Sequence, residues 1–194
     1  AAMFITAGGR WRDVFILGFV ALAMIAALAF VRPYLMDRIT SFFDPSSDPL
    51  GSSYQVQQSL IAVGSGGLSG RGFGQSIQKF EYLPEPIGDS IFAVFAEEFG
   101  FIGSLILILL ISSFVFRGFR IATHAKDQFG MLLVVGFVTL IAIQSFLNIA
   151  AMVALAPMLG LPLPFISHGG TALLATLASV GIILNVSKHQ KQRI

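Results

Sequence analysis

Three carboxylates lie at the start of one apolar run of the sequence or inside it. Asp89 comes just before the run, and Glu97 and Glu98 lie within it. A carboxylate in the hydrocarbon of a membrane is costly, so such residues are functional candidates by default. A carboxylate at the boundary between apolar and aqueous surroundings can take a proton from a hydroxyl group. Asp89 is therefore a candidate general base.

Each of these acids also has a structural interpretation. Asp is a preferred N-cap and its charge suits a helix N-terminus, so N-capping is the favoured interpretation of Asp89. Glu97 would lie about 12 Å further along the helix and about 80° round from Asp89. It could face the same cavity or hydrogen-bond to a neighbouring helix, whereas Glu98 is expected to face another helix.

Basic residues precede Asp89 in the sequence. Arg71 and Lys79 are candidates for contact with a diphosphate or a sugar, and acidic Glu85 lies between them and Asp89. Cations of this kind hold phosphate groups. The group suits a substrate with an anionic head and a lipid tail.

Further polar candidates lie toward the end of the chain. Gln144 and Asn148 are spaced i, i+4, so they share one helix face, where polar residues usually join helices. Ser167 follows a segment that Pro157, Pro162 and Pro164 prevent from forming a continuous helix. Glu97, Gln144, Asn148 and Ser167 are therefore expected to line or support a cavity.

The glycine-rich segment GSGGLSGRGFG, residues 64–74, matches neither a dinucleotide fingerprint nor a P-loop. A flexible turn is the favoured interpretation. The alternative is that its backbone approaches a bulky ligand closely, which glycine permits.

The composition places the chain in a membrane. Of its 194 residues, 55% are hydrophobic and 11% are charged, with a mean hydropathy of +0.83. An ordinary soluble domain is about 25% charged. The absence of Cys excludes disulfides and thiolate ligands, and a net charge of +2 is too small to indicate nucleic-acid binding.

We expect an all-α, polytopic transmembrane bundle. Four runs reach spanning length, and lipid admits only helices or closed barrels. A long loop, residues 32–88, would contain a short interfacial or re-entrant helix within residues 54–64. The four expected spans are residues 14–31, 91–116, 129–154 and 171–186.

The positive-inside rule sets the expected orientation. Lys and Arg flank the start of the first span, the link between the second and third, and the end of the fourth. Both ends of the chain are therefore expected in the cytoplasm, with the 32–88 loop outside. Because the chain begins abruptly in AAMFITAGGR, we expect it to be the C-terminal part of a longer single membrane domain.

Two long stretches and one shorter segment carry a family resemblance. DPLGSSYQVQQSLIAVGSGGLSGRGFGQSIQKFEYLPE followed by DSIFAVFAEEFG, together with LPLPFISHGG, resembles the SEDS family of cell-wall polymerases, the FtsW/RodA/SpoVE group. QKFEYLPE is more similar to the FtsW and SpoVE branch. The family usually has Thr-Asp-Phe where this chain has Gly88-Asp89-Ser90, and Ser-Tyr-Gly-Gly where it has Ser167-His168-Gly169-Gly170.

This resemblance implies an enzyme of the bacterial inner membrane, a peptidoglycan glycosyltransferase with its active side outside the cytoplasm. It would polymerise lipid II into β-1,4 glycan with inversion and release undecaprenyl diphosphate, for division or cell shape. Asp89 would be the catalytic residue, or would hold a divalent cation such as Mg²⁺ or Mn²⁺. The implied partners are the undecaprenyl-linked glycan, a class B penicillin-binding protein transpeptidase and other division proteins.

Two other functions are compatible with these residues. A flippase or transporter for lipid-linked precursors would also use Glu97 and Glu98 inside the membrane and a broken helical segment. A non-catalytic division scaffold would need none of the candidate chemistry.

Overall fold

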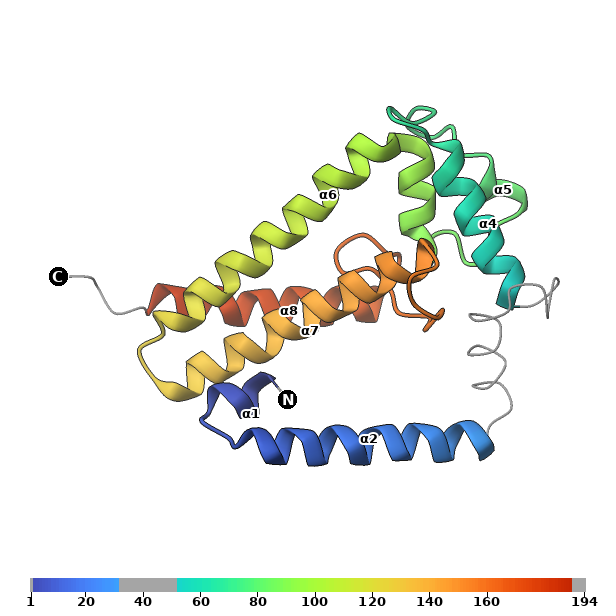
Figure 1. Ribbon diagram of the computed structural model, residues 1–194. Helices are drawn as coiled ribbons and strands as arrows, with labels where there is room; N and C mark the ends of the chain where they lie inside the picture. Colours follow the sequence, from blue (N-terminus) through green and yellow to red (C-terminus); the bar gives the residue numbers. More distant parts are fainter. Residues whose placement is uncertain (1, 32–51, 190–194) are drawn as a thin grey trace.

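The computed structural model describes residues 2–31 and 52–189, and every regular element in these ranges is a helix. The elements are α1 (Ala2–Thr6), α2 (Trp11–Val31), α4 (Ser52–Ser65), α5 (Gln78–Glu81), α6 (Ile91–Thr123), α7 (Gln128–Met152) and α8 (Gly170–Lys188). Figure 1 shows α6, α7 and α8 approaching one another at one end of the molecule, with α2 apart from them. The short helix α1 lies near that end, against α7, and α4 and α5 lie at the opposite end beside the first part of α6.

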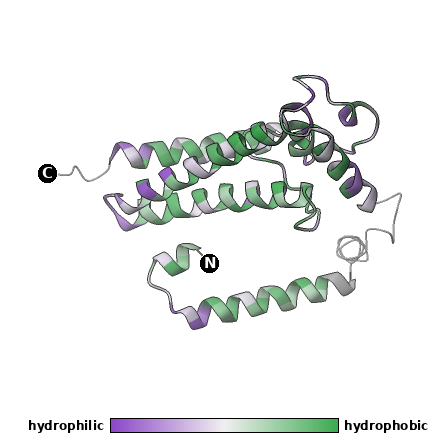
Figure 2. Cartoon of the chain, turned by 45° about the horizontal axis from the view of Figure 1, so that its top comes forward, coloured by the Kyte–Doolittle hydropathy of each residue, from purple (hydrophilic) through white to green (hydrophobic). Residues whose placement is uncertain are grey.

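Four of these helices, α2, α6, α7 and α8, are long and apolar enough to cross a membrane. Figure 2 shows hydrophobic residues along their length and hydrophilic residues near their ends. The predicted all-α polytopic class is confirmed. The helix expected within residues 54–64 is α4, whereas residues 32–51 of the expected outer loop lie outside the described residues.

The second expected span, residues 91–116, is not one straight helix. At Gly100 φ is 67° and ψ is −164°, a conformation essentially restricted to glycine. Figure 1 shows a sharp bend that divides α6 into residues 91–99 and residues 101–123. The second part is about 35 Å long at 1.5 Å per residue, enough to cross the hydrocarbon by itself. The sequence suggested that Glu97 lies deeper than Asp89 in one continuous span. Glu97 instead lies before the bend, outside the part of α6 that is long enough to cross the membrane.

The bend at Gly100 separates backbone groups that a continuous helix would pair. The 64–74 loop supplies their partners. The nitrogens of Arg71 and Gly72 donate to the carbonyls of Glu97 and Glu98, both at 3.0 Å. In return, the nitrogens of residues 101 and 102 donate to the carbonyls of Gly67 (2.9 Å) and Leu68 (3.1 Å).

These reciprocal backbone hydrogen bonds explain the glycine-rich composition of the loop. A Cβ on Gly66 would collide with the carbonyl oxygen of Ala96, and one on Gly70 would collide with that of Glu98. The loop is therefore a backbone clasp on α6. The segment is not the flexible turn that was favoured, because its backbone is hydrogen-bonded to α6. The alternative, a close approach of its backbone to a bulky ligand, stays a prediction.

A buried apolar cluster holds α4, the first part of α6 and the end of α7 together. Phe92, Met152 and Leu163 are each no more than 2% exposed and fill its centre. Because Phe92 lies only three residues after Asp89, this packing fixes the start of α6 and with it the position of the candidate base.

Candidate active site around Asp89

Asp89 is half-buried in the turn that leads into α6. The N-cap of α6 is Ser90, which makes no side-chain capping bond, so the predicted N-cap role of Asp89 was wrong. Gln55 Nε2 of α4 donates to Asp89 Oδ1 at 3.3 Å and to Ser90 Oγ at 3.0 Å. Ser90 Oγ in turn donates to the carbonyl of Pro84 at 3.0 Å. Among the described residues, none donates to Asp89 Oδ2.

Three successive backbone carbonyls, those of residues 87, 88 and 89, are each held by a donor from later in the chain. The donors are the backbone nitrogen of His168 to Ile87 (2.8 Å), Ser167 Oγ to Gly88 (2.6 Å) and Asn148 Nδ2 to Asp89 (2.6 Å). The backbone of Asp89 is thereby fixed from two other elements, while one oxygen of its carboxylate has no donor within the part of the chain that the structure describes.

Two of these donors, Ser167 and His168, belong to the Pro-rich segment of residues 157–168, and α7 holds this segment in place. Asn148 Nδ2 also donates to the carbonyl of Leu161 (2.7 Å), and Gln144 Nε2 donates to that of Pro162 (2.9 Å). Ser167 Oγ accepts from the nitrogen of Leu163 at 2.7 Å. The i, i+4 pair on α7 thus supports a loop, and does not join two helices as expected.

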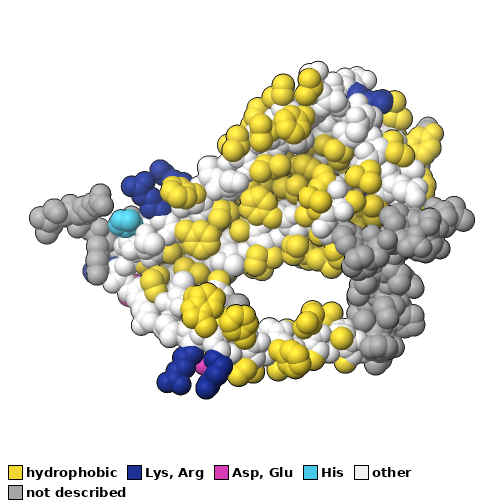
Figure 3. Space-filling view, in the orientation of Figure 1, with side chains coloured by type: hydrophobic (Ala, Val, Ile, Leu, Met, Phe, Trp, Pro, Cys, Tyr) yellow, Lys and Arg dark blue, Asp and Glu magenta, His cyan; other side chains and the backbone are white. Residues whose placement is uncertain are grey.

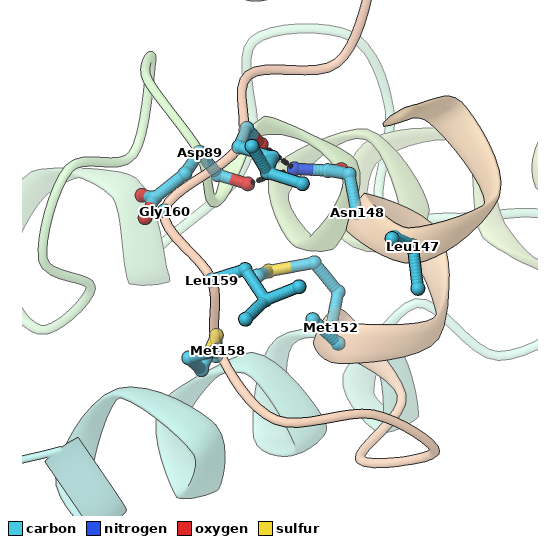
Figure 4. A pocket seen from close by; sticks show the side chains of 9 residues that line it. Asp89, Leu147, Asn148, Met152, Met158, Leu159 and Gly160 are labelled. Carbon is cyan, nitrogen blue, oxygen red and sulfur yellow. Dashed lines mark hydrogen bonds between the residues drawn. The ribbon is translucent and has the colours of Figure 1, made fainter. Parts of the chain in front are cut away.

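A small pocket lies beside this clamp, lined by Asp89, Asn148, Met152, Met158 and Leu159 among others. Figure 4 shows the Asp89 carbonyl turned toward Asn148, and its carboxylate turned the other way. Asn148 Oδ1 is buried and has no partner among the described residues. The water-accessible volume is about 10 Å³, roughly enough for one water molecule.

Replacement of Asn148 by Ala should lower thermal stability measurably. It would leave two carbonyls without their donor in a site where Asn148 is 3% exposed, and an unsatisfied buried polar group costs about 1–3 kcal/mol. The matched control is Gln144→Ala, which removes a single bond from a half-buried residue. Equal melting temperatures for the two variants would contradict the role of Asn148 as a clamp.

Glu97 is fully buried and does not line the pocket beside Asp89. Its carboxylate accepts from Ser76 Oγ at 2.6 Å and from the nitrogens of Ile77 and Gln78 at 3.2 and 3.3 Å. Arg71 Nε lies 3.5 Å from the same carboxylate. Of the two interpretations, the structure supports hydrogen bonding to a neighbouring element, because the donors lie in the turn that leads into α5 and at its first residue, Gln78.

Glu98 and the predicted phosphate-binding residues are also engaged in this region. Lys79 Nζ lies 2.6 Å from Glu98 Oε1, so Glu98 faces α5, the other helix it was expected to meet. Arg71 and Lys79 each have a carboxylate partner, and both clamp the 71–79 segment to α6. Glu85 is exposed in the loop before Asp89, with φ at 46°. Substrate contact by these three residues remains a prediction.

No cluster of three or more His, Cys, Asp or Glu side chains able to hold a metal ion occurs within residues 2–31 and 52–189. A hard cation such as Mg²⁺ is often bound through one or two carboxylates together with substrate phosphates. Asp89, whose second oxygen has no donor among the described residues, fits that kind of site and does not fit an all-protein cage.

Two features of the site escaped sequence reasoning. Gln55 lies more than thirty residues before Asp89, and no local pattern links the two. The pairing between the 64–74 loop and α6 could have been inferred from Gly100, a glycine inside an apolar run, which often marks a break or a close approach.

Comparisons with known proteins agree with this architecture. A model of the FtsW/RodA/SpoVE family, described as cell cycle proteins, matches residues 1–192. The chain is 47% identical over 189 residues to stage V sporulation protein E of Bacillus subtilis (strain 168), covering 97% of the chain and 52% of that protein. It is 41% identical to a probable peptidoglycan glycosyltransferase FtsW of Geobacter sp. (strain M18), with the same two coverages.

A solved structure shares the fold. It is described as showing the structural coordination of polymerization and crosslinking by a peptidoglycan synthase complex, and it superposes with a TM-score of 0.72 at 28% identity. The match covers 99% of this chain and 53% of that one. The chain thus spans about half the length of the proteins it matches. On sequence and on structure alike, it belongs to the FtsW/RodA/SpoVE family.

Proposed function

We propose that the intact protein is a peptidoglycan glycosyltransferase that polymerises lipid II into β-1,4 glycan strands. The observation that carries this proposal is the arrangement of Asp89. Three hydrogen bonds to the carbonyls of residues 87–89 fix its backbone, while its Oδ2 accepts from no donor among the described residues. The relatives named as probable peptidoglycan glycosyltransferases support the reaction class.

In the proposed reaction, Asp89 acts as general base. It takes the proton from the 4-hydroxyl of the acceptor sugar as that oxygen bonds to the anomeric carbon of the donor. The bond from that carbon to the diphosphate breaks, and its electrons leave with undecaprenyl diphosphate. Attack opposite the leaving group inverts the anomeric carbon. A diphosphate leaves readily, so a second carboxylate acting as an acid is unnecessary.

The substrate's diphosphate needs cations or a metal ion near Asp89. We propose that Arg71 or Lys79 contributes if its ion pair opens on binding, and that Glu85 lies at the entrance. Asp89 is also the residue that would hold Mg²⁺ or Mn²⁺ against the diphosphate. Glu97, Gln144, Asn148 and Ser167 act as supports, as their contacts with backbone groups indicate.

The remaining proposals concern place and partners. The protein lies in the bacterial inner membrane with the Arg- and Lys-bearing helix ends in the cytoplasm and Asp89 on the outer side. The structural relative is a peptidoglycan synthase complex that coordinates polymerization with crosslinking. This likeness supports a transpeptidase partner of the class B penicillin-binding type, together with other division proteins.

The buried acids that favoured a transporter now have another explanation, because Glu97 and Glu98 bind α5 and the 71–79 segment. The decisive test uses the purified intact protein reconstituted with lipid II and its transpeptidase partner. We expect glycan chains that a muramidase degrades. Movement of lipid II between leaflets without any polymer would show a transporter. If the protein had neither activity, the scaffold function would be the one that remains.

A further inference from the structure

A groove of about 660 Å³ lies between α6 and α8, at the end of the molecule away from Asp89. Both walls use residues on successive helical turns. The lining residues are Phe114, Arg117, Gly118, Arg120, Ile121 and His124 from α6, and Val180, Ile183, Leu184 and Ser187 from α8. Nothing in the proposed polymerisation uses this groove.

The groove has a basic end and an apolar end. Arg117 and Arg120 are exposed, and neither forms an ion pair with any residue in the described part of the chain. No Asp or Glu lines the groove among the described residues. The nearest acid along the chain, Asp127, is occupied in capping α7, where its Oδ2 accepts from Gly130 at 2.9 Å. Figure 3 shows Lys and Arg side chains gathered at this end of the helices.

The apolar end runs from the arginines toward the middle of the helices. Phe114 lies about one turn before Arg117, and Val180 and Leu184 face it from α8. Gly118 keeps the base of the groove close to α7, because a Cβ there would collide with Val138. The groove thus offers two cations on successive turns of α6 and a hydrocarbon surface on the turn before them.

We infer that this groove binds an anionic phospholipid of the inner leaflet, with its phosphate on Arg117 and Arg120 and an acyl chain against Phe114, Val180 and Leu184. Basic pockets between transmembrane helices on the cytoplasmic side suit lipid head groups. The inference rests on the orientation proposed above and not on the catalytic role of Asp89.

The test is retention of lipid by the intact protein, measured by native mass spectrometry after transfer from nanodiscs of phosphatidylglycerol and phosphatidylcholine. The double variant Arg117→Gln/Arg120→Gln should bind phosphatidylglycerol about 30-fold more weakly than the unchanged protein. The matched control, Arg10→Gln/Arg12→Gln, removes two arginines from the same proposed face but outside the groove, and should leave retention unchanged.

A second variant tests the apolar end with both arginines in place. Val180→Trp fills part of the groove and should also reduce retention. Equal losses in the groove and control variants would overturn the inference, because they would show only a general attraction to charge. Unchanged retention in the groove variant, or full displacement of the lipid by inorganic phosphate, would overturn it as well. Lipid II is absent from the measurement, so failure of the polymerase proposal would not affect the result.

Discussion

Asp89→Asn in the intact protein should reduce the rate of lipid II polymerisation by about 10²–10⁴-fold, the usual contribution of a general base. The amide keeps nearly the same shape and can still meet the bond from Gln55 Nε2 through its oxygen. The clamp acts on the carbonyls of residues 87–89 and does not require the carboxylate. Folding and substrate binding should therefore survive while catalysis is lost.

Two measurements separate this outcome from a structural defect. Binding of lipid II and the melting temperature should stay close to those of the unchanged protein. The matched control is Asp13→Asn, since Asp13 is a partly exposed carboxylate on α2 whose contact is with neighbouring Arg12. If polymerisation by the Asp89→Asn protein continued at the original rate, Asp89 would not be the base.

Gly100→Ala should produce the largest loss of stability. The backbone there adopts φ 67° and ψ −164°, which a side chain strongly disfavours. The added Cβ would also meet the nitrogen of Gly70 and the carbonyl of Leu68. Strain of this kind costs about 1–3 kcal/mol, and the collision with backbone adds to it. We expect the 64–74 loop to detach from α6.

Detachment can be followed by hydrogen–deuterium exchange at the backbone amides of residues 71, 72, 101 and 102. These amides donate the hydrogen bonds between the loop and the helix. All four should lose protection together. The control is Gly64→Ala in α4, where a Cβ meets nothing within 4 Å. Protection equal to that of the unchanged protein in Gly100→Ala would contradict the role given to this glycine.

The long helices could be predicted from the sequence because hydrophobic length is a direct signal. The third and fourth expected spans end within two residues of α7 and α8. The second failed at Gly100, because a single glycine inside an apolar run does not reveal that a distant loop will pair with the freed backbone. Hydropathy alone treats residues 91–116 as continuous.

The site was predicted as a set of residues but not as an arrangement. Asp89, Asn148 and Ser167 were each identified, and the structure brings them together through backbone carbonyls, which a sequence pattern cannot show. For the cations the sequence did not show the partners: Arg71 and Lys79 each lie against a buried glutamate, and their contact with phosphate stays a prediction. The sequence shows which charges exist, but the pairing depends on the bend in α6.

The most direct test is a structure of the intact protein with an acceptor glycan bound. If Asp89 is the base, one of its carboxylate oxygens lies about 2.6–3.2 Å from the acceptor's 4-hydroxyl, the reach required of a general base. A bound acceptor whose 4-hydroxyl meets a different base, with Asp89 turned away from it, would contradict the account.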